Sequence, residues 1–305
     1  MRVSIMGQAA FGEAVLKRLR DDGVDVAGVS APAPPEGGRP DALWAAAEAA
    51  GLPLVAAASL KDRQGLERWS TLEADLCVMA FVTDIIPDEV LNIPRLGTIQ
   101  YHPSLLPLHR GSSAINWAVI NGDVETGLSI FWPDNGIDTG PVLLQKRCPI
   151  GPNDTVASLY FDRLFPMGID ALSEAVALVT AGNAPRIEQD HAQSTYEPPC
   201  SERHAEIHWH EPAERISALV RGCNPQPGAW AMFAGEKLRV YDSTLTGGHE
   251  PEMPGRVLCI DEQGFEVRLN GGVLRVTRVQ PDGQKKLGAG DWAQSAGLKP
   301  GFRFR

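Results

Sequence analysis

The chain has 305 residues, of which 43% are hydrophobic and 22% are charged. This composition is typical of a globular protein with one large domain or two ordinary ones. No apolar run approaches the ~18 residues of a spanning helix, and residues 1–7 read as a strand rather than a cleavable signal. We therefore expect a cytoplasmic protein without a membrane partner. Five cysteines, odd in number and without CxxC spacing, predict buried thiols rather than disulfides.

The net charge of −10 is unevenly distributed along the chain. Residues 1–203 contain 15 Lys and Arg against 26 Asp and Glu, whereas residues 204–305 contain 13 against 12. Nucleic-acid binding requires a concentrated basic face, which neither part provides. We do not expect a nucleic-acid partner.

The first 30 residues have a strand–helix–strand pattern, at 2–7, 11–20 and 24–29. This pattern predicts a parallel sheet with a right-handed crossover. The turn at residues 7–12 resembles a dinucleotide-binding fingerprint. However, Ala9 replaces the middle glycine and no acidic residue closes the second strand. These differences favour a purely structural turn over nucleotide binding.

Further elements follow a Pro/Gly-rich loop at residues 31–40. Hydrophobic periodicity predicts strands at 52–55, 76–81, 97–101, 127–132 and 142–147, and helical segments at 41–50, 65–69, 85–90, 114–120 and 154–179. We expect an α/β fold with a Rossmann-like, mostly parallel sheet over residues 1–190.

Residues 182–200 show little periodicity, and we place an interdomain linker at 191–203. A helix is expected at 213–221, followed by short strands with glycine turns at 230–233, 238–241, 255–260, 265–269 and 273–279. Closely spaced short strands of this kind predict a small OB-like β-barrel over residues 204–305.

Two polar segments carry the candidate chemistry. His102 follows the strand 97–101, and Gln100 lies two residues earlier, so both side chains project to the same face of the strand. An amide and an imidazole on one face can stabilise the oxyanion of a carbonyl that becomes tetrahedral, each donor contributing ~3–4 kcal/mol. Asp138 lies in a glycine-flanked loop and, paired with His102, would form a proton-handling couple. Taken singly, His102 and Asp138 are more simply explained as loop-capping residues.

Other polar residues near these segments have simpler explanations. Ser104 lacks a glycine elbow, so it is not expected to be a nucleophile and would act through hydrogen bonds. Arg110 and Gly111 either begin the helix at 114–120 or face the substrate. His208 and His210 lack acidic or Cys partners at suitable spacing, and His191, His204 and His249 are scattered, so we predict no metal site.

The motifs His102-Pro-Ser-Leu-Leu-Pro107, Arg110-Gly111 and Asp138-Thr-Gly140 resemble the signature of folate-dependent formyltransferases. Residues 207–209 and 224–230 resemble the C-terminal module of two-domain members. Within the family, the stretches 114–117, 129–132, 144–146 and 164–166 are most similar to the N-terminal hydrolase part of 10-formyltetrahydrofolate dehydrogenase. The resemblance extends over nearly the whole chain.

The resemblance implies a Rossmann-like catalytic domain, a small barrel, and 10-formyltetrahydrofolate as the formyl donor. It implies His102, Asp138 and Gln100 as the catalytic positions, and Ser104, Arg110 and Gly111 as substrate-facing ones. The pterin would be bound between two segments, through Met79, Phe81, Val82, Ile86, Pro87, Trp132, Asp134, Gly136 and Ile137. From its own surroundings, Asp134 reads as a solvated loop residue.

Two departures from the family pattern matter. The transferases have Asn where this chain has Gln100, and the dehydrogenase's hydrolase domain has an aliphatic residue there. The 305 residues contain neither the carrier-like nor the aldehyde dehydrogenase domain of the full dehydrogenase, so we do not expect NADP-dependent oxidation.

Three acceptors remain open, and the sequence does not define the oligomeric state. The hydrolase-like stretches suggest water, and the amide at Gln100 suggests a small amine. Methionyl-tRNA is the third, ranked lower because the loop 32–40 carries a single cation, Arg39. A non-catalytic folate-binding module is the alternative from a different class.

Overall fold

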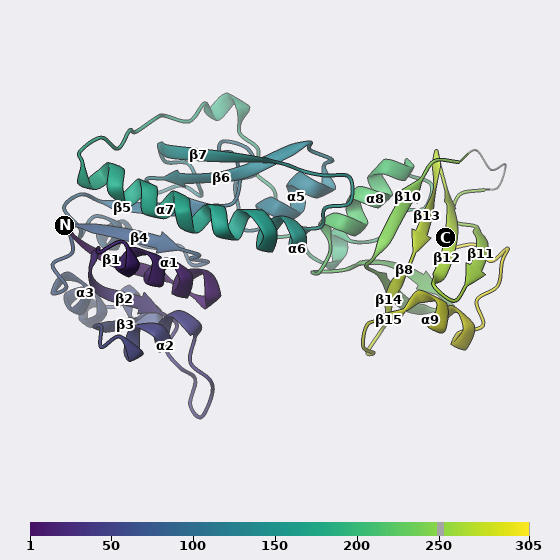
Figure 1. Cartoon of the computed structure of the whole chain (residues 1–305), viewed down its shortest axis with the longest axis horizontal. Coiled ribbons are helices and arrows are strands. Elements are labelled where there is room, and N and C mark those ends of the chain that lie inside the picture. The colour runs from purple at the N-terminus through teal and green to yellow at the C-terminus, as the bar shows by residue number, and fades with distance from the viewer. Residues whose placement is uncertain (249–252, 305) are drawn as a thin grey trace. The chain divides into compact units, whose positions relative to one another are not determined.

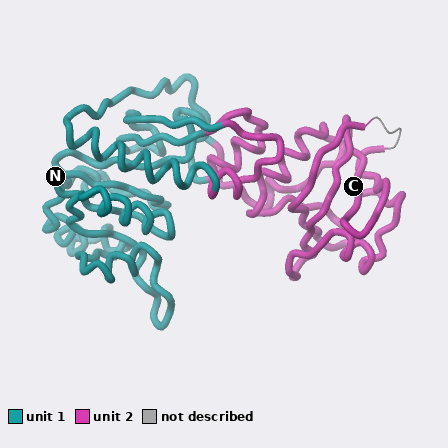
Figure 2. Tube along the Cα trace, in the orientation of Figure 1, with its two compact units in different colours: residues 1–112, 127–148, 162–196 teal, residues 113–126, 149–161, 197–305 magenta. Residues whose placement is uncertain are grey.

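A computed structural model describes residues 1–248 and 253–304, so His249 lies outside the described residues (Figure 1). The chain divides into two compact units (Figure 2). Unit 1 comprises residues 1–112, 127–148 and 162–196, and unit 2 comprises 113–126, 149–161 and 197–305. The boundaries 1–190, 191–203 and 204–305 remain a prediction. In the described part of the chain, no helix has the length and apolarity to cross a membrane.

Unit 1 is built on a seven-stranded sheet with the order β3-β2-β1-β4-β5-β6-β7. The pairs β1–β2, β2–β3, β1–β4 and β4–β5 are parallel, and β5–β6 is antiparallel. The predicted Rossmann-like, mostly parallel sheet is therefore confirmed. The strands are β1 (Arg2–Gly7), β2 (Asp25–Ala31), β3 (Leu54–Ala56), β4 (Leu76–Ala80), β5 (Thr98–His102), β6 (Glu125–Phe131) and β7 (Val142–Pro149).

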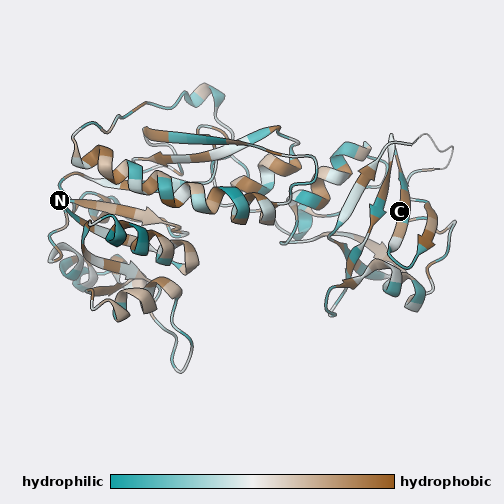
Figure 3. Ribbon diagram, viewed as in Figure 1, coloured by the Kyte–Doolittle hydropathy of each residue, from teal (hydrophilic) through white to brown (hydrophobic). Residues whose placement is uncertain are grey.

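Helices cover both faces of this sheet because alternate strand residues bury opposite sides. In β4, Leu76 and Val78 join a core formed with α1, α2 and α7, while Cys77 and Met79 join a second core with the 3-10 segment η1 and with α3 and α4. Figure 3 shows the resulting hydrophobic strands beside helices that carry both hydrophobic and hydrophilic residues. The helical segments are α1 (Ala9–Asp21), α2 (Ala42–Ala49), η1 (Ala57–Lys61), α3 (Arg63–Ser70), α4 (Asp88–Leu91) and α7 (Phe165–Thr180).

The turn that resembles a dinucleotide fingerprint is occupied by the protein itself. The Asp41 carboxylate accepts a hydrogen bond of 2.8 Å from the Ala9 amide, and its other oxygen caps α2 by accepting from Leu43 at 2.9 Å. Gly7 is required because a Cβ there would lie 2.1 Å from the Ala80 carbonyl oxygen of the adjacent β4. These contacts agree with the structural explanation of the turn.

The helix expected after Pro87 in the segment 85–90 is confirmed as α4, which begins at Asp88 because Pro87 has an extended backbone and acts as its N-cap. The expected helix at 154–179 consists of three segments: α6 (Val156–Leu159), the π-helical η2 (Tyr160–Leu164) and α7. The hydrophobic spacing of the sequence does not separate these segments.

The described residues of unit 2 form eight strands in two antiparallel four-stranded sheets, with the orders β10-β13-β12-β11 and β15-β14-β9-β8. Side chains of both sheets share one hydrophobic core with α8 and α9. This is the architecture expected of a small β domain, although the pairings among the described residues form two sheets. The strands are β8 (Ala229–Phe233), β9 (Glu236–Val240), β10 (Ser243–Thr246), β11 (Val257–Asp261), β12 (Gly264–Leu269), β13 (Gly272–Val276), β14 (Arg278–Pro281) and β15 (Leu287–Gly288).

The expected single strand at 273–279 is wrong. The chain leaves β13 at Thr277, whose amide donates to the Asp242 carbonyl, and β14 then pairs with β9 in the other sheet. The expected helices 114–120 and 213–221 are confirmed as α5 (Ala114–Ile120) and α8 (Ala213–Gly222). Strands β10 and β15 and helix α9 (Ala289–Ser295) were not predicted.

A close approach of α7 to the sheet supports the strand that carries His102. A Cβ on Gly168 would lie 2.7 Å from a ring carbon of Tyr101 in β5 and 2.9 Å from one of Phe11 in α1. The Phe11 and Tyr101 rings are themselves 4.6 Å apart, centroid to centroid. Only glycine allows α7 to lie against this aromatic pair.

We expect Gly168→Val to lower the free energy of unfolding by roughly 1–3 kcal/mol, because the added methyl groups overpack the Phe11–Tyr101 contact. Urea unfolding followed by tryptophan fluorescence measures this. Gly247→Val is the control, since a Cβ at Gly247 meets no atom within 4 Å and the position is exposed. Equal midpoints for the two variants would contradict the packing argument.

Candidate active site

His102 is the last residue of β5, and its ring is buried, with 5% of the residue exposed. Strand register places it opposite Ser129 of β6 and places Gln100 opposite Phe131. The ring nitrogen Nε2 lies 2.9 Å from the His109 carbonyl oxygen. Because a carbonyl only accepts, Nε2 must carry the proton, and Nδ1 is the nitrogen that faces the acidic loop.

Asp138 is brought to His102 from the loop between β6 and β7. Its Oδ2 lies 3.6 Å from His102 Nδ1, with 10% of the Asp138 side chain exposed. The same oxygen accepts a hydrogen bond of 2.8 Å from the Gly111 amide. The distance of 3.6 Å is an ion-pair separation and is too long for a hydrogen bond. The predicted meeting of an imidazole and a carboxylate is therefore present in the structure.

The acidic loop follows a tight backbone path. Asp138 has a φ of +55°, in the left-handed region that Asp tolerates better than most residues. A Cβ on Gly140 would lie 1.8 Å from the Trp132 carbonyl oxygen, and one on Gly136 would lie 1.9 Å from Thr139 Oγ1. Glycine is therefore required on both sides of Asp138, as the sequence suggested.

Gln100 lies in the same strand as His102 with its side chain half-buried. Its amide has no hydrogen-bond partner in the described part of the chain. It is thus available to a ligand that reaches this face of β5.

The turn after His102 is fixed by a buried hydroxyl. Ser129 Oγ donates to the Ser104 carbonyl at 2.7 Å and accepts from the Leu106 amide at 3.0 Å and from Gln145 Nε2 at 2.9 Å. Ser104 is fully buried, and its own hydroxyl donates to the Leu108 carbonyl at 2.6 Å. The structure therefore gives Ser104 a hydrogen-bonding role within the turn.

Residues 187–196 also contact the site, which sequence reasoning missed. Gln189 Oε1 accepts from Arg110 Nη2 at 2.7 Å, and that guanidinium also contacts His191 Nδ1 at 3.0 Å. Thr195 Oγ1 accepts from the His109 amide at 2.8 Å, and the Thr195 carbonyl accepts from the Arg110 amide at 3.1 Å. No sequence pattern indicates these contacts, because residues 182–200 show little periodicity.

The residues assigned to the pterin by resemblance fall into two groups. After β4, Phe81 has a φ of +62° and is 42% exposed, Val82, Ile86 and Pro87 are partly exposed, and Met79 is buried in the strand. In the acidic loop, Ile137 is 46% exposed, and Asp134 Oδ1 accepts from Gly136 N at 3.0 Å and Thr139 Oγ1 at 2.5 Å.

Trp132 is placed differently from the others. Its indole N–H donates to the Pro185 carbonyl at 3.0 Å, Arg186 lies 3.9 Å above its ring, and ring atoms approach Gly97 at the start of β5. Trp132 therefore packs near the end of β5 opposite to His102.

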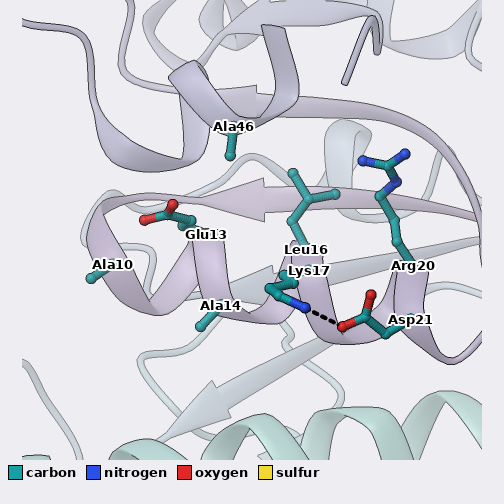
Figure 4. Close-up of a pocket in the computed structure, with 8 residues that line it drawn as sticks. All are labelled: Ala10, Glu13, Ala14, Leu16, Lys17, Arg20, Asp21 and Ala46. Carbon is teal, nitrogen blue, oxygen red and sulfur yellow. Dashed lines mark hydrogen bonds and ion pairs between the residues drawn. The ribbon is translucent and has the colours of Figure 1, made fainter. Parts of the chain in front are cut away.

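A surface depression of about 610 Å³ lies elsewhere in unit 1. Figure 4 shows that it is lined by side chains of α1, including Glu13, Lys17 and Arg20, with Ala46 of α2 opposite. It contains neither His102 nor Asp138, so the site is identified by its chemistry and not by this cavity. No group of three His, Cys, Asp or Glu able to hold a metal exists among the described residues, and the rings of His208 and His210 are 6.1 Å apart.

We expect Ser129→Ala to lower the free energy of unfolding by about 1–3 kcal/mol, because it leaves the buried Ser104 carbonyl and Leu106 amide without their partner. Urea unfolding gives the value. Ser70→Ala, which removes an exposed hydroxyl bonded to the Glu67 carbonyl, should change it by no more than about 0.5 kcal/mol. A loss at Ser129 as small as that at Ser70 would show that the hydroxyl does not hold the turn.

The chain is similar to proteins of known family. A family model described as formyl transferase matches residues 1–176, and one described as formyl transferase, C-terminal domain, matches residues 200–297. Cytosolic 10-formyltetrahydrofolate dehydrogenase of Xenopus laevis is 37% identical over 97% of this chain, and this chain spans 34% of that protein. Methionyl-tRNA formyltransferase of Moorella thermoacetica is 37% identical over 99% of this chain and 98% of its own length.

A solved structure shares the fold. The N-formyltransferase from Helicobacter canadensis, in complex with folinic acid and dTDP-3-aminofucose, has a TM-score of 0.71 at 18% identity, covering 92% of this chain and 98% of that one. The resemblance drawn from the motifs at residues 102–111 and 138–140 is confirmed, and the chain belongs to the formyl transferase family.

Proposed function

We propose that this enzyme takes the formyl group of 10-formyltetrahydrofolate and releases tetrahydrofolate, using His102, Asp138 and Gln100. The observation that carries the proposal is the buried His102 ring with its Nδ1 3.6 Å from Asp138 Oδ2. Support for the donor comes from the named substrate of the dehydrogenase relatives and from the folinic acid in the Helicobacter canadensis structure. The first-named relatives are about three times as long as this chain, so their complete activity is not assigned to it.

His102 supplies the oxyanion donor in this mechanism. Nε2 donates its proton to the His109 carbonyl, so Nδ1 is the ring nitrogen that would donate a hydrogen bond to the oxygen of the reacting formyl group. The Gln100 amide, on the same face of β5, is the second donor to the developing oxyanion.

Asp138 receives the proton of the nucleophile. Gly111 holds Oδ2 toward the histidine, and Oδ1 has no hydrogen-bond partner among the described residues, so it can accept a proton. Attack of the nucleophile on the formyl carbon produces the tetrahedral species. Its collapse breaks the bond to the folate nitrogen, which takes up the proton that Asp138 accepted. The products are tetrahydrofolate and the formylated amine, or formate when the nucleophile is water.

We propose folate contacts for the partly exposed residues after β4 and in the acidic loop: Phe81, Val82, Ile86, Pro87, Asp134, Gly136 and Ile137. Met79 and Trp132 are buried in different cores, and Trp132 packs near the other end of β5, so the two would contribute indirectly. Ser104, Arg110 and Gly111 would shape the acceptor side through the turn that they hold. A cytoplasmic location is in keeping with the cytosolic dehydrogenases among the relatives.

We propose water or a small amine as the acceptor of the formyl group. The dehydrogenase-like stretches of the sequence favour water, and the amide at Gln100 favours a small amine. Methionyl-tRNA is the second candidate. It is favoured by the relative that matches this chain over nearly the full length of both. The acidic balance of residues 1–203 and the single cation in the loop 32–40 weigh against it.

We expect His102→Ala and Asp138→Asn each to abolish formyl release, because the first removes the oxyanion donor and the second the proton acceptor. Turnover is measured as tetrahydrofolate produced from 10-formyltetrahydrofolate. Folate binding and the thermal midpoint should change little.

Matched controls are His210→Ala and Asp291→Asn, which alter exposed residues of unit 2. These variants should retain wild-type turnover. Near-full activity in His102→Ala or Asp138→Asn would refute the catalytic assignment.

The acceptor can be identified with the wild-type enzyme. We expect tetrahydrofolate release from 10-formyltetrahydrofolate with water alone, or on addition of amino sugars or other small amines. Release only with methionyl-tRNA would establish the second candidate. Tight folate binding without release under any of these conditions would indicate a non-catalytic folate-binding module.

A further inference from the structure

The side chain of Gln189 joins the two segments that form the candidate site. It comes from residues 187–196, is 7% exposed, and makes three hydrogen bonds. Oε1 accepts from Arg110 Nη2 at 2.7 Å, and Nε2 donates to the Asp138 carbonyl at 2.9 Å and to the Gly140 carbonyl at 2.7 Å. Each of these three hydrogen bonds pairs a donor with an acceptor.

The orientation of the amide is determined by its surroundings. A guanidinium only donates and a carbonyl only accepts, so exchanging the oxygen and nitrogen of Gln189 would place like groups together at all three contacts. Glutamate, which has the same shape, keeps the contact with Arg110 but puts an oxygen against the two carbonyls.

These bonds act on the backbone of the residue whose carboxylate faces His102. Asp138 has a φ of +55°, a conformation that costs a non-glycine residue free energy and persists only when its neighbours hold it. Gln189 binds the carbonyl of Asp138 and that of Gly140, while the Gly111 amide binds the carboxylate. The backbone and the carboxylate of Asp138 are thus held by different partners.

We propose that Gln189 is a positioning residue that sets the 3.6 Å approach of Asp138 to His102, through its two donated hydrogen bonds to the acidic loop. The inference rests on the proposed function of His102 and Asp138. It adds that this chemistry depends on a side chain some 50 residues further along the chain, which does not itself touch the reacting atoms.

The test compares Gln189→Glu and Gln189→Met with wild type. Glutamate removes both donors to the acidic loop and keeps the Arg110 contact, whereas methionine removes all three bonds. We expect kcat for formyl release to fall at least tenfold in both variants. The dissociation constant for tetrahydrofolate should change less than threefold, because the group acts on Asp138 and not on the folate.

Gln193→Glu is the matched control, since Gln193 lies in the same segment, is exposed, and bonds only Asp190 in the described structure. It should leave kcat at the wild-type value. Wild-type kcat in Gln189→Glu, with a loss confined to Gln189→Met, would assign the effect to Arg110 and overturn the proposal. A fall in thermal midpoint and folate affinity with kcat per folded site unchanged would overturn it in favour of a merely structural role.

Failure of the proposed function gives a different result. In that case wild type itself releases no tetrahydrofolate with any acceptor, and no variant comparison is made. An active wild type with an unimpaired Gln189→Glu rejects only the positioning role.

Discussion

The structure around the site depends on the hydrogen bond from the Gly111 amide to the Asp138 carboxylate. A hydrogen bond to a charged group contributes about 1.5–3 kcal/mol, and a carboxylate this buried has few alternatives in water. This bond links the turn after β5 to the loop after β6. Without it, the carboxylate would have no fixed direction relative to His102. The other contacts of the site, through Ser129, Thr195 and Gln189, hold the two ends of this link in place.

The proposed site therefore does not come from one strand or one loop. The ring of His102 comes from the end of β5, the carboxylate from the β6–β7 loop, and the groups that orient them from the turn at 104–111 and the segment 187–196. Glycines at 136 and 140 bring the loop close to its own backbone, and Gly168 brings α7 against the strand that carries the histidine. Close backbone approach at these three points makes the arrangement compact enough to bury the His102 ring and most of the Asp138 side chain.

Much of this could be predicted from the sequence, for identifiable reasons. Strands β1, β2, β4 and β5 are short apolar runs with turn residues at their ends, and the polar motif at 102–111 stands out against them. The proximity of His102 and Asp138 could be predicted because a histidine at a strand end and an acid between glycines are unusual. The contacts of Gln189 and Thr195 with the site could not be predicted. Their hydrogen-bond partners are distant in sequence, and their own segment has no hydrophobic periodicity. The division of residues 273–279 between two sheets was missed for a similar reason, because the β-propensity of the run continues across Thr277.

The Asp41–Ala9 hydrogen bond has a consequence for the first turn of the fold. In many α/β proteins the free amides at this position attract the phosphates of a nucleotide. Here a carboxylate of the same chain is already bound, and because it is tethered, its effective concentration at the amide is high. An anion that binds here would have to displace the Asp41 carboxylate from the Ala9 amide. Displacement would also remove the N-cap of α2, because the same carboxylate accepts from the Leu43 amide. The Asp41 carboxylate thus occupies the amide that binds a nucleotide phosphate in other α/β proteins.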